Sequence, residues 1–135
     1  MKKRTVWLSL FLGLAVIATA QDEAAYKTWM KSMPGTMAEM NKNAKAGDWK
    51  AVAPDAKKAE EVFTKSAEFW TKKGGGDDAV TMSKEAAAAA AKLSAAASSG
   101  DAAGAEAALK AVGGSCRGCH TAHRDKAEDG SYKIK

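Results

Sequence analysis

The sequence predicts an all-α protein that folds as an antiparallel, up-down-up-down four-helix bundle. After its first twenty residues the chain is rich in alanine, lysine, glutamate and methionine, which favour helices, and poor in β-branched residues. Glycine and aspartate interrupt it at intervals that suit short turns between helices. No run of alternating apolar and polar residues indicates a strand. Four amphipathic helices with short loops are typical of a bundle, and 135 residues suffice for one such domain.

The first twenty residues have the three parts of a secretory signal peptide. Residues 1–4 carry positive charge, residues 6–17 are almost wholly apolar, and Ala18-Thr19-Ala20 fits the small-x-small cleavage rule. The apolar stretch is too short to be preferred as a membrane span, although an uncleaved anchor is a minor alternative. We therefore expect cleavage before Gln21, export to the periplasm, and one mature domain over residues 21–135.

The charge of the expected mature chain argues against a nucleic-acid partner. The formal net charge is +5 for the whole chain, and it falls to +2 when the three basic residues of the signal segment are removed. No basic stripe interleaved with aromatic residues is present in the remainder.

The first helix is expected from about Asp22 to Ala44 and carries an unusual number of methionines. Its apolar residues form one broad face: Trp29, Met30, Met33, Met37 and Met40. Pro34-Gly35 lies within this segment, and a proline removes one backbone hydrogen bond and clashes with the preceding turn. We therefore expect a kink there, or a break into two shorter helices.

The second helix is expected to begin near Asp48 and to stop at Gly74-Gly75-Gly76. Pro54 falls early enough in this segment to be tolerated. Core-facing residues recur at spacings of four and three, which predicts a buried helix face: Val52, Ala56, Ala59, Phe63, Ser66 and Trp70.

The third and fourth helices follow from the remaining turn signals. The third opens with Asp77 and Asp78 as candidate caps and closes at Ser99-Gly100. The fourth starts at Asp101, runs to about Glu128, and is followed by a frayed tail. The alanine-rich third helix has small side chains, so a neighbouring helix or a flat cofactor could approach it closely.

Residues 116–120 read Cys-Arg-Gly-Cys-His, which is the attachment signature of c-type haem. In such a site both thiols add to the porphyrin vinyl groups and the adjacent imidazole ligates the iron. On a helix, positions i, i+3 and i+4 share one face, so Cys116, Cys119 and His120 would point at the same cofactor. An oxidising compartment would tend to pair two free cysteines, and haem attachment would consume both.

Two alternatives remain for this motif. Cys116 and Cys119 could form a thiol redox pair, or half of a zinc site in a haem-free bundle. A zinc site would need both histidines of the chain, His120 and His123, in an unusually compact geometry.

The sequence resembles the class II cytochromes c, the cytochrome c prime family. The shared features are an export signal, about 115 mature residues, four helices, and a haem motif near the C-terminus of the last helix. Mitochondrial-type cytochromes c carry the motif near the N-terminus instead. The family commonly continues the motif as Cys-x-x-Cys-His-x-x-Tyr-Arg. This chain matches the two cysteines, the histidine and Arg124, and has His123 in place of the tyrosine.

The resemblance implies one covalent haem c and suggests roles for two further residues. Arg124 is expected beside the proximal face or a haem propionate, and its spacing from His120 on a helix permits this placement. Met30 lies where the family places its distal residue, which makes it a candidate sixth ligand, with Met33 and Met37 as alternatives. A methionine stripe is equally consistent with core filling. His123 lies on the same helix face as His120, so it cannot reach the opposite side of the porphyrin.

The resemblance also implies a periplasmic electron carrier, which is not an enzyme and works with redox proteins as partners. No carboxylate pair, Ser-His-Asp arrangement or phosphate loop accompanies the motif. The alternative within the family is a high-spin haem protein that binds small gases such as NO or CO. A homodimer is compatible with either function, and no stable membrane span is expected after cleavage.

Overall fold

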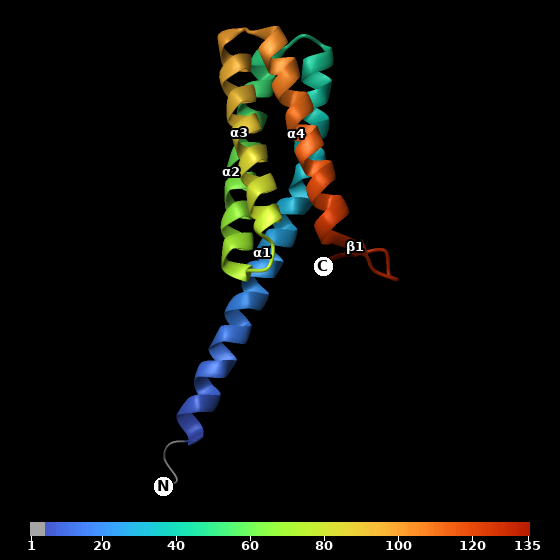
Figure 1. Ribbon diagram of the computed structural model, residues 1–135. Coiled ribbons are helices and arrows are strands. Elements are labelled where there is room, and N and C mark those ends of the chain that lie inside the picture. The colour runs from blue at the N-terminus through green and yellow to red at the C-terminus, as the bar shows by residue number, and fades with distance from the viewer. Residues whose placement is uncertain (1–4) are drawn as a thin grey trace.

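The chain forms four long helices followed by a small hairpin (Figure 1). The computed structural model describes residues 5–135, with side chains described from Ala20 onward. The helices are α1 (Thr5–Lys45), α2 (Trp49–Lys73), α3 (Asp77–Ser99) and α4 (Ala102–His123), and the strands are β1 (Arg124–Lys126) and β2 (Tyr132–Ile134). The four-helix bundle predicted from the sequence is therefore confirmed. Within this part of the chain, no helix combines the length and apolarity that crossing a bilayer requires.

Helix α1 is continuous through Pro34, so the expected division into two shorter helices is wrong. Proline cannot donate a hydrogen bond to the carbonyl of Met30, four residues earlier. The Pro34 side chain is exposed, whereas Met33 and Met40 are buried against the other helices. Burial of this face stabilises the helix and offsets the lost backbone bond. The N-terminal part of α1 extends beyond the other three helices (Figure 1).

Aspartate side chains cap two helices at the predicted starts. Asp48 accepts a hydrogen bond from the backbone N–H of Ala51 at 3.1 Å, and Asp101 accepts one from Gly104 at 3.0 Å. A Cβ atom at position 104 would collide with the Asp101 carboxylate, so the glycine there makes room for the cap. The prediction of aspartate caps on α3 is wrong. Gly76 occupies that position, and Asp77 and Asp78 lie in the first turn, where their charge suits the helix dipole.

The core consists of two adjoining clusters of buried side chains. All six residues of the predicted stripe on α2 are buried. The larger cluster joins α2 to the small residues of α3, to α4 and to the middle of α1. The smaller one contains Tyr26, Phe69, Trp70 and Ala79. Tyr26 stacks on Phe69 with ring centroids 4.3 Å apart, which anchors α1 to the C-terminal half of α2.

Residues 124–134 fold into an antiparallel hairpin, so both the extension of the last helix to Glu128 and the frayed tail are wrong. Helix α4 ends at His123. Gly130 has φ 83°, a left-handed conformation that suits glycine and allows the tight turn. The backbone N–H of Lys135 donates to the carbonyl of His123 at 3.1 Å, and Ile134 packs against the Tyr26 cluster. These contacts hold the hairpin at the end of the bundle.

Candidate haem site

Cys116, Cys119 and His120 line one pocket together, as their spacing on a helix predicts. All three lie on α4 and are partly buried. The Cβ that Gly118 lacks would lie 3.4 Å from the Met82 sulfur, so α4 approaches α3 closely at this point. The motif is therefore directed toward the interior of the bundle.

The other helices supply the facing wall of this pocket. Helix α1 contributes Met30 and Met33, which are thus brought opposite the cysteines, whereas Met37 does not line the pocket and packs against the main core cluster. The remaining lining residues come from all four helices: Tyr26, Phe63, Ser66, Met82, Ser83, Ala86 and Ser115.

The donor set fits a c-type haem in its chemistry, with two thiols and an imidazole on one helix face. The space enclosed between the lining side chains is about 30 Å³, close to the volume of one water molecule. A porphyrin would therefore need the volume that side chains such as Met30, Met33 and Met82 fill. Methionine is unbranched and adapts readily, so these residues suit a wall that reshapes around a cofactor.

Burial shifts the pKa values of the three motif side chains. It raises the pKa of both Cys116 and Cys119 above the ordinary thiol value, and the nearby Asp78 charge adds to the effect at Cys119. Thiol redox proteins depend on a lowered pKa, so these environments do not favour that alternative. Burial, together with the Arg124 charge, lowers the pKa of His120. The imidazole is thereby kept neutral, which is the form that binds a metal.

Arg124 lies near His120 but on a different element, at the start of β1. Its backbone N–H donates to the carbonyl of His120. Its guanidinium lies over the ring of Tyr132, 4.0 Å from the centroid, which is a cation–π contact. The hairpin rather than a further helical turn thus positions this charge.

His123 binds Asp78 and so ties α4 to the first turn of α3. Its Nε2 atom lies 2.8 Å from Asp78 Oδ2, and its ring lies 4.8 Å from that of Trp70. In the described part of the chain, no group of three or more His, Cys, Asp or Glu side chains could hold a metal ion. The zinc alternative therefore finds no ligand set there.

Sequence reasoning missed a set of buried polar side chains beside the motif. The Ser66 and Ser83 hydroxyls hydrogen-bond each other at 2.9 Å, and Trp70 Nε1 donates to the Tyr26 hydroxyl at 3.3 Å. Ser66 was recognised as part of the α2 stripe but only as a packing residue. A serine at an otherwise apolar stripe position was the available signal, because a buried hydroxyl needs a partner.

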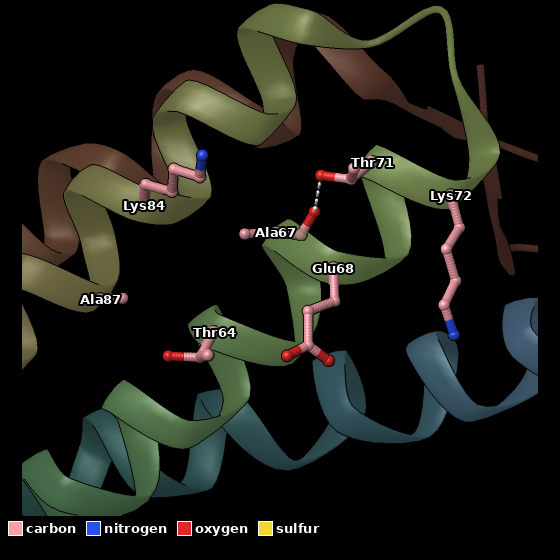
Figure 2. Close-up of a pocket in the computed structure, with 7 residues that line it drawn as sticks. All are labelled: Thr64, Ala67, Glu68, Thr71, Lys72, Lys84 and Ala87. Carbon is pink, nitrogen blue, oxygen red and sulfur yellow. Dashed lines mark hydrogen bonds between the residues drawn. The ribbon is translucent and has the colours of Figure 1, made fainter.

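A larger and more open groove of about 420 Å³ lies between α2 and α3 (Figure 2). Its lining contains none of the motif residues, and it uses the opposite face of α2 from Ser66 and Trp70. The Thr71 hydroxyl donates to the Ala67 carbonyl within α2, at 2.8 Å. The groove is therefore separate from the pocket that contains the motif.

Comparison with known proteins identifies the family. The family model described as cytochrome C' matches residues 57–124, about half of the chain, including the whole motif. No curated protein matches the sequence significantly.

Two solved structures share the fold. One is a cytochrome c prime with ligand-controlled dimer dissociation, which has 16% identity and a TM-score of 0.64 over 87% of this chain and 97% of its own. The other is a nitric oxide complex of a mutant cytochrome c prime from Alcaligenes xylosoxidans, with 23% identity and a TM-score of 0.57 over 87% and 96%. This chain therefore belongs to the cytochrome c prime family, whose members carry one covalently attached haem c.

Proposed function

We propose that this cytochrome is a periplasmic electron carrier. In this proposal Cys116 and Cys119 form the two thioether bonds, His120 is the proximal iron ligand, and Met30 is the distal one. The haem iron supplies the one-electron couple. The chain offers no carboxylate pair, Ser-His-Asp arrangement or phosphate loop, so we propose no turnover of a substrate.

The observation that carries the proposal is the arrangement of methionines opposite the motif. Met30 and Met33 from α1 line the same pocket as Cys116, Cys119 and His120. A thioether sulfur is a soft donor that favours ferrous iron and raises the reduction potential, as in other His/Met cytochromes. An iron atom with such a sixth ligand has no free coordination position for a gas. Cycling of the iron between its ferric and ferrous states requires no additional ligand.

The structure around the motif supports a rigid site. Helix α4 is held at its start by the Asp101 cap, near its end by the His123–Asp78 bond, and beyond its end by the hairpin. Electron transfer is favoured when the surroundings of the metal change little between oxidation states. We therefore assign a positioning role to these three attachments.

A redox titration of the purified holoprotein, followed by its visible spectrum, tests the proposal. A low-spin, six-coordinate spectrum in both oxidation states with a reversible one-electron couple is the expected result. A protein with haem but no reversible couple would rule out electron transfer.

Gas binding is the second candidate, favoured by the structural relative that forms a complex with nitric oxide. In this case Met30 would only fill space, and the sixth position would be open or weakly blocked. Carbon monoxide added to the reduced protein separates the two functions. Rapid formation of a carbonyl adduct supports the gas-binding function, and an unchanged spectrum supports the electron carrier.

Export and assembly complete the proposal. We propose that residues 1–20 direct the chain to the periplasm and are removed before Gln21. N-terminal sequencing of the protein from a periplasmic extract tests this step.

We also propose a homodimer, by likeness to the relative whose dimer dissociates under ligand control. Sedimentation analysis with and without carbon monoxide tests this proposal.

A further inference from the structure

Four buried polar side chains form a network of two neighbouring hydrogen-bonded pairs beside the motif. Tyr26, Ser66, Trp70 and Ser83 are 7%, 2%, 2% and 4% exposed. Trp70 Nε1 donates to Tyr26 Oη, and the Ser66 and Ser83 hydroxyls bond each other. The two pairs are neighbours, because Ser66 is close enough to the Tyr26 hydroxyl to act to lower the pKa of Tyr26. The network therefore links α1, α2 and α3.

The network holds more hydrogens than its own bonds use. The indole of Trp70 donates one hydrogen and cannot accept, and each of the three hydroxyls carries one hydrogen. Four hydrogens are thus available for two hydrogen bonds, one between Trp70 and Tyr26 and one between the two serines. Whichever way the hydroxyls turn, at least one O–H is left to donate outside the network.

The usual acceptor for a spare serine hydrogen on a helix is the carbonyl one turn earlier. Ser115 and Thr71 use this acceptor, donating to Ala111 at 3.1 Å and to Ala67 at 2.8 Å. The Ser66 and Ser83 hydroxyls are instead directed across the helix interface toward each other. Tyr26, Ser66 and Ser83 all line the pocket that contains the haem motif, so the pocket is where the spare hydrogen can find an acceptor.

We propose that Tyr26, Ser66 and Ser83 form a hydrogen-bond-donating wall that gives one O–H hydrogen to a lone-pair acceptor held in the pocket. The acceptor is an oxygen of a haem carboxylate or an atom of a small molecule bound to the iron. The inference rests on the proposed attachment of haem at Cys116 and Cys119. It adds a polar recognition element to a site whose other facing residues are mostly apolar.

The surroundings of Tyr26 keep the phenol in its donating form. Burial raises the pKa of Tyr26, an effect larger than the opposing one of its hydrogen bonds. The ring is fixed by stacking on Phe69 and by edge contact with Trp70, whose centroid lies 6.0 Å away. The hydroxyl is thus held in place rather than free to turn toward solvent.

The test uses holoprotein variants that each remove one hydroxyl: Tyr26→Phe, Ser66→Ala and Ser83→Ala. Ser115→Ala is the matched control, because Ser115 lines the same pocket but donates within its own helix. Two vibrational measurements report on the two kinds of acceptor. The C–O stretching frequency of the ferrous carbonyl adduct, measured with each variant in a Met30→Ala background that opens the sixth position, reports on a donor to an iron-bound molecule. The propionate bending mode in the resonance Raman spectrum reports on a donor to a haem carboxylate.

A shift of either mode in the Tyr26 or serine variants, beyond that of Ser115→Ala, supports the proposal and identifies the acceptor. If no variant shifts either mode more than the control does, the proposal is wrong. Tyr26→Phe keeps the ring that stacks on Phe69, so it decides the question if a serine variant fails to fold. Staining for covalent haem in the parent protein comes first, since its absence overturns both proposals. If haem is attached but shows no reversible couple, the proposal of electron transfer is wrong and the proposal of a donating wall is unaffected.

Discussion

The His123 imidazole lies 2.8 Å from the Asp78 carboxylate, and this contact joins the last turn of α4 to the first turn of α3. His123 stands at the position where the motif of the family commonly has tyrosine. The Asp78 carboxylate lies in the first turn of α3, where the helix dipole favours its negative charge.

This contact predicts a specific dependence of stability on pH. The hydrogen bond from His123 is the main cause that lowers the pKa of Asp78 below its ordinary value of 3.8. A lowered carboxyl pKa contributes stability that is fully present above the ordinary value and is lost as the pH falls through the lowered one. We expect Asp78→Asn to remove this part of the acid dependence of the unfolding free energy, measured in urea from about pH 5 to about pH 2.

Asp77→Asn is the control, since Asp77 lies in the same first turn and has the same charge. An equal change in the two variants would show that general charge, rather than the bond to His123, governs the acid dependence.

Replacement of Met30 distinguishes a ligand from a packing residue. If its sulfur is the sixth ligand, Met30→Ala converts the iron to a high-spin form, lowers the reduction potential and admits carbon monoxide. If it is packing alone, the spectrum stays unchanged and the loss of side-chain volume costs about 2–5 kcal/mol of stability. Met33→Ala tests the other methionine of the pocket wall. Met37→Ala serves as control, because Met37 packs in the core instead.

Loss of the attachment cysteines is expected to destabilise the fold. The core relies on the many alanines of α3, and a bound cofactor stabilises the native state. The Cys116→Ala, Cys119→Ala double variant is therefore expected to lose more than the roughly 1 kcal/mol typical of a point substitution. Thermal unfolding with haem staining measures this. A double variant as heat-stable as the holoprotein would refute the expectation.

Arg124 is expected to raise the reduction potential of the bound haem. Its charge acts on His120, and a cation near the proximal ligand favours the ferrous over the ferric state. Arg124→Gln should lower the potential, and added salt should reduce the difference because the side chain is exposed. Lys126→Gln, two residues along the same strand, makes the same charge change as a control. Equal shifts of the reduction potential in both variants would show that the net charge of the protein, rather than the position of Arg124, sets the potential.

Removal of residues 1–20 should leave the bundle intact. Residues 5–20 of α1 extend beyond the other helices (Figure 1), and Tyr26 is the first buried side chain that the structure describes. A chain that starts at Gln21 is expected to match the full chain within about 0.5 kcal/mol in unfolding free energy. A markedly less stable product would show that the N-terminal segment packs on the bundle and argue against its removal.

Local signals in the sequence predicted most of the helices. The ends of α2 and α3 follow from glycines with positive φ, Gly74 and Gly100, and the starts of α2 and α4 follow from the Asp48 and Asp101 caps. The stripe on α2 was predicted completely because its period matches the helix. Such features depend on residues close together in the chain, which the sequence displays directly.

The predictions that were wrong concern features that depend on residues far apart in the sequence. The continuity of α1 at Pro34 depends on the burial of its methionine face by other helices, and the hairpin depends on contacts of Ile134 with the cluster around Tyr26. Within the site, the spacing of Cys116, Cys119 and His120 was sufficient to predict the motif. The serine pair and the contact between His123 and Asp78 join residues 17 and 45 positions apart, and no local pattern identifies which residue is the partner.

The position of the haem motif in the last helix also sets an order of events during biosynthesis. The ribosome makes the chain from its N-terminus, so α1, α2 and α3 are complete before Cys116 exists. The serine pair between α2 and α3 can form at that stage, because neither partner requires α4. Haem is thus attached to a segment that is made after the other three helices.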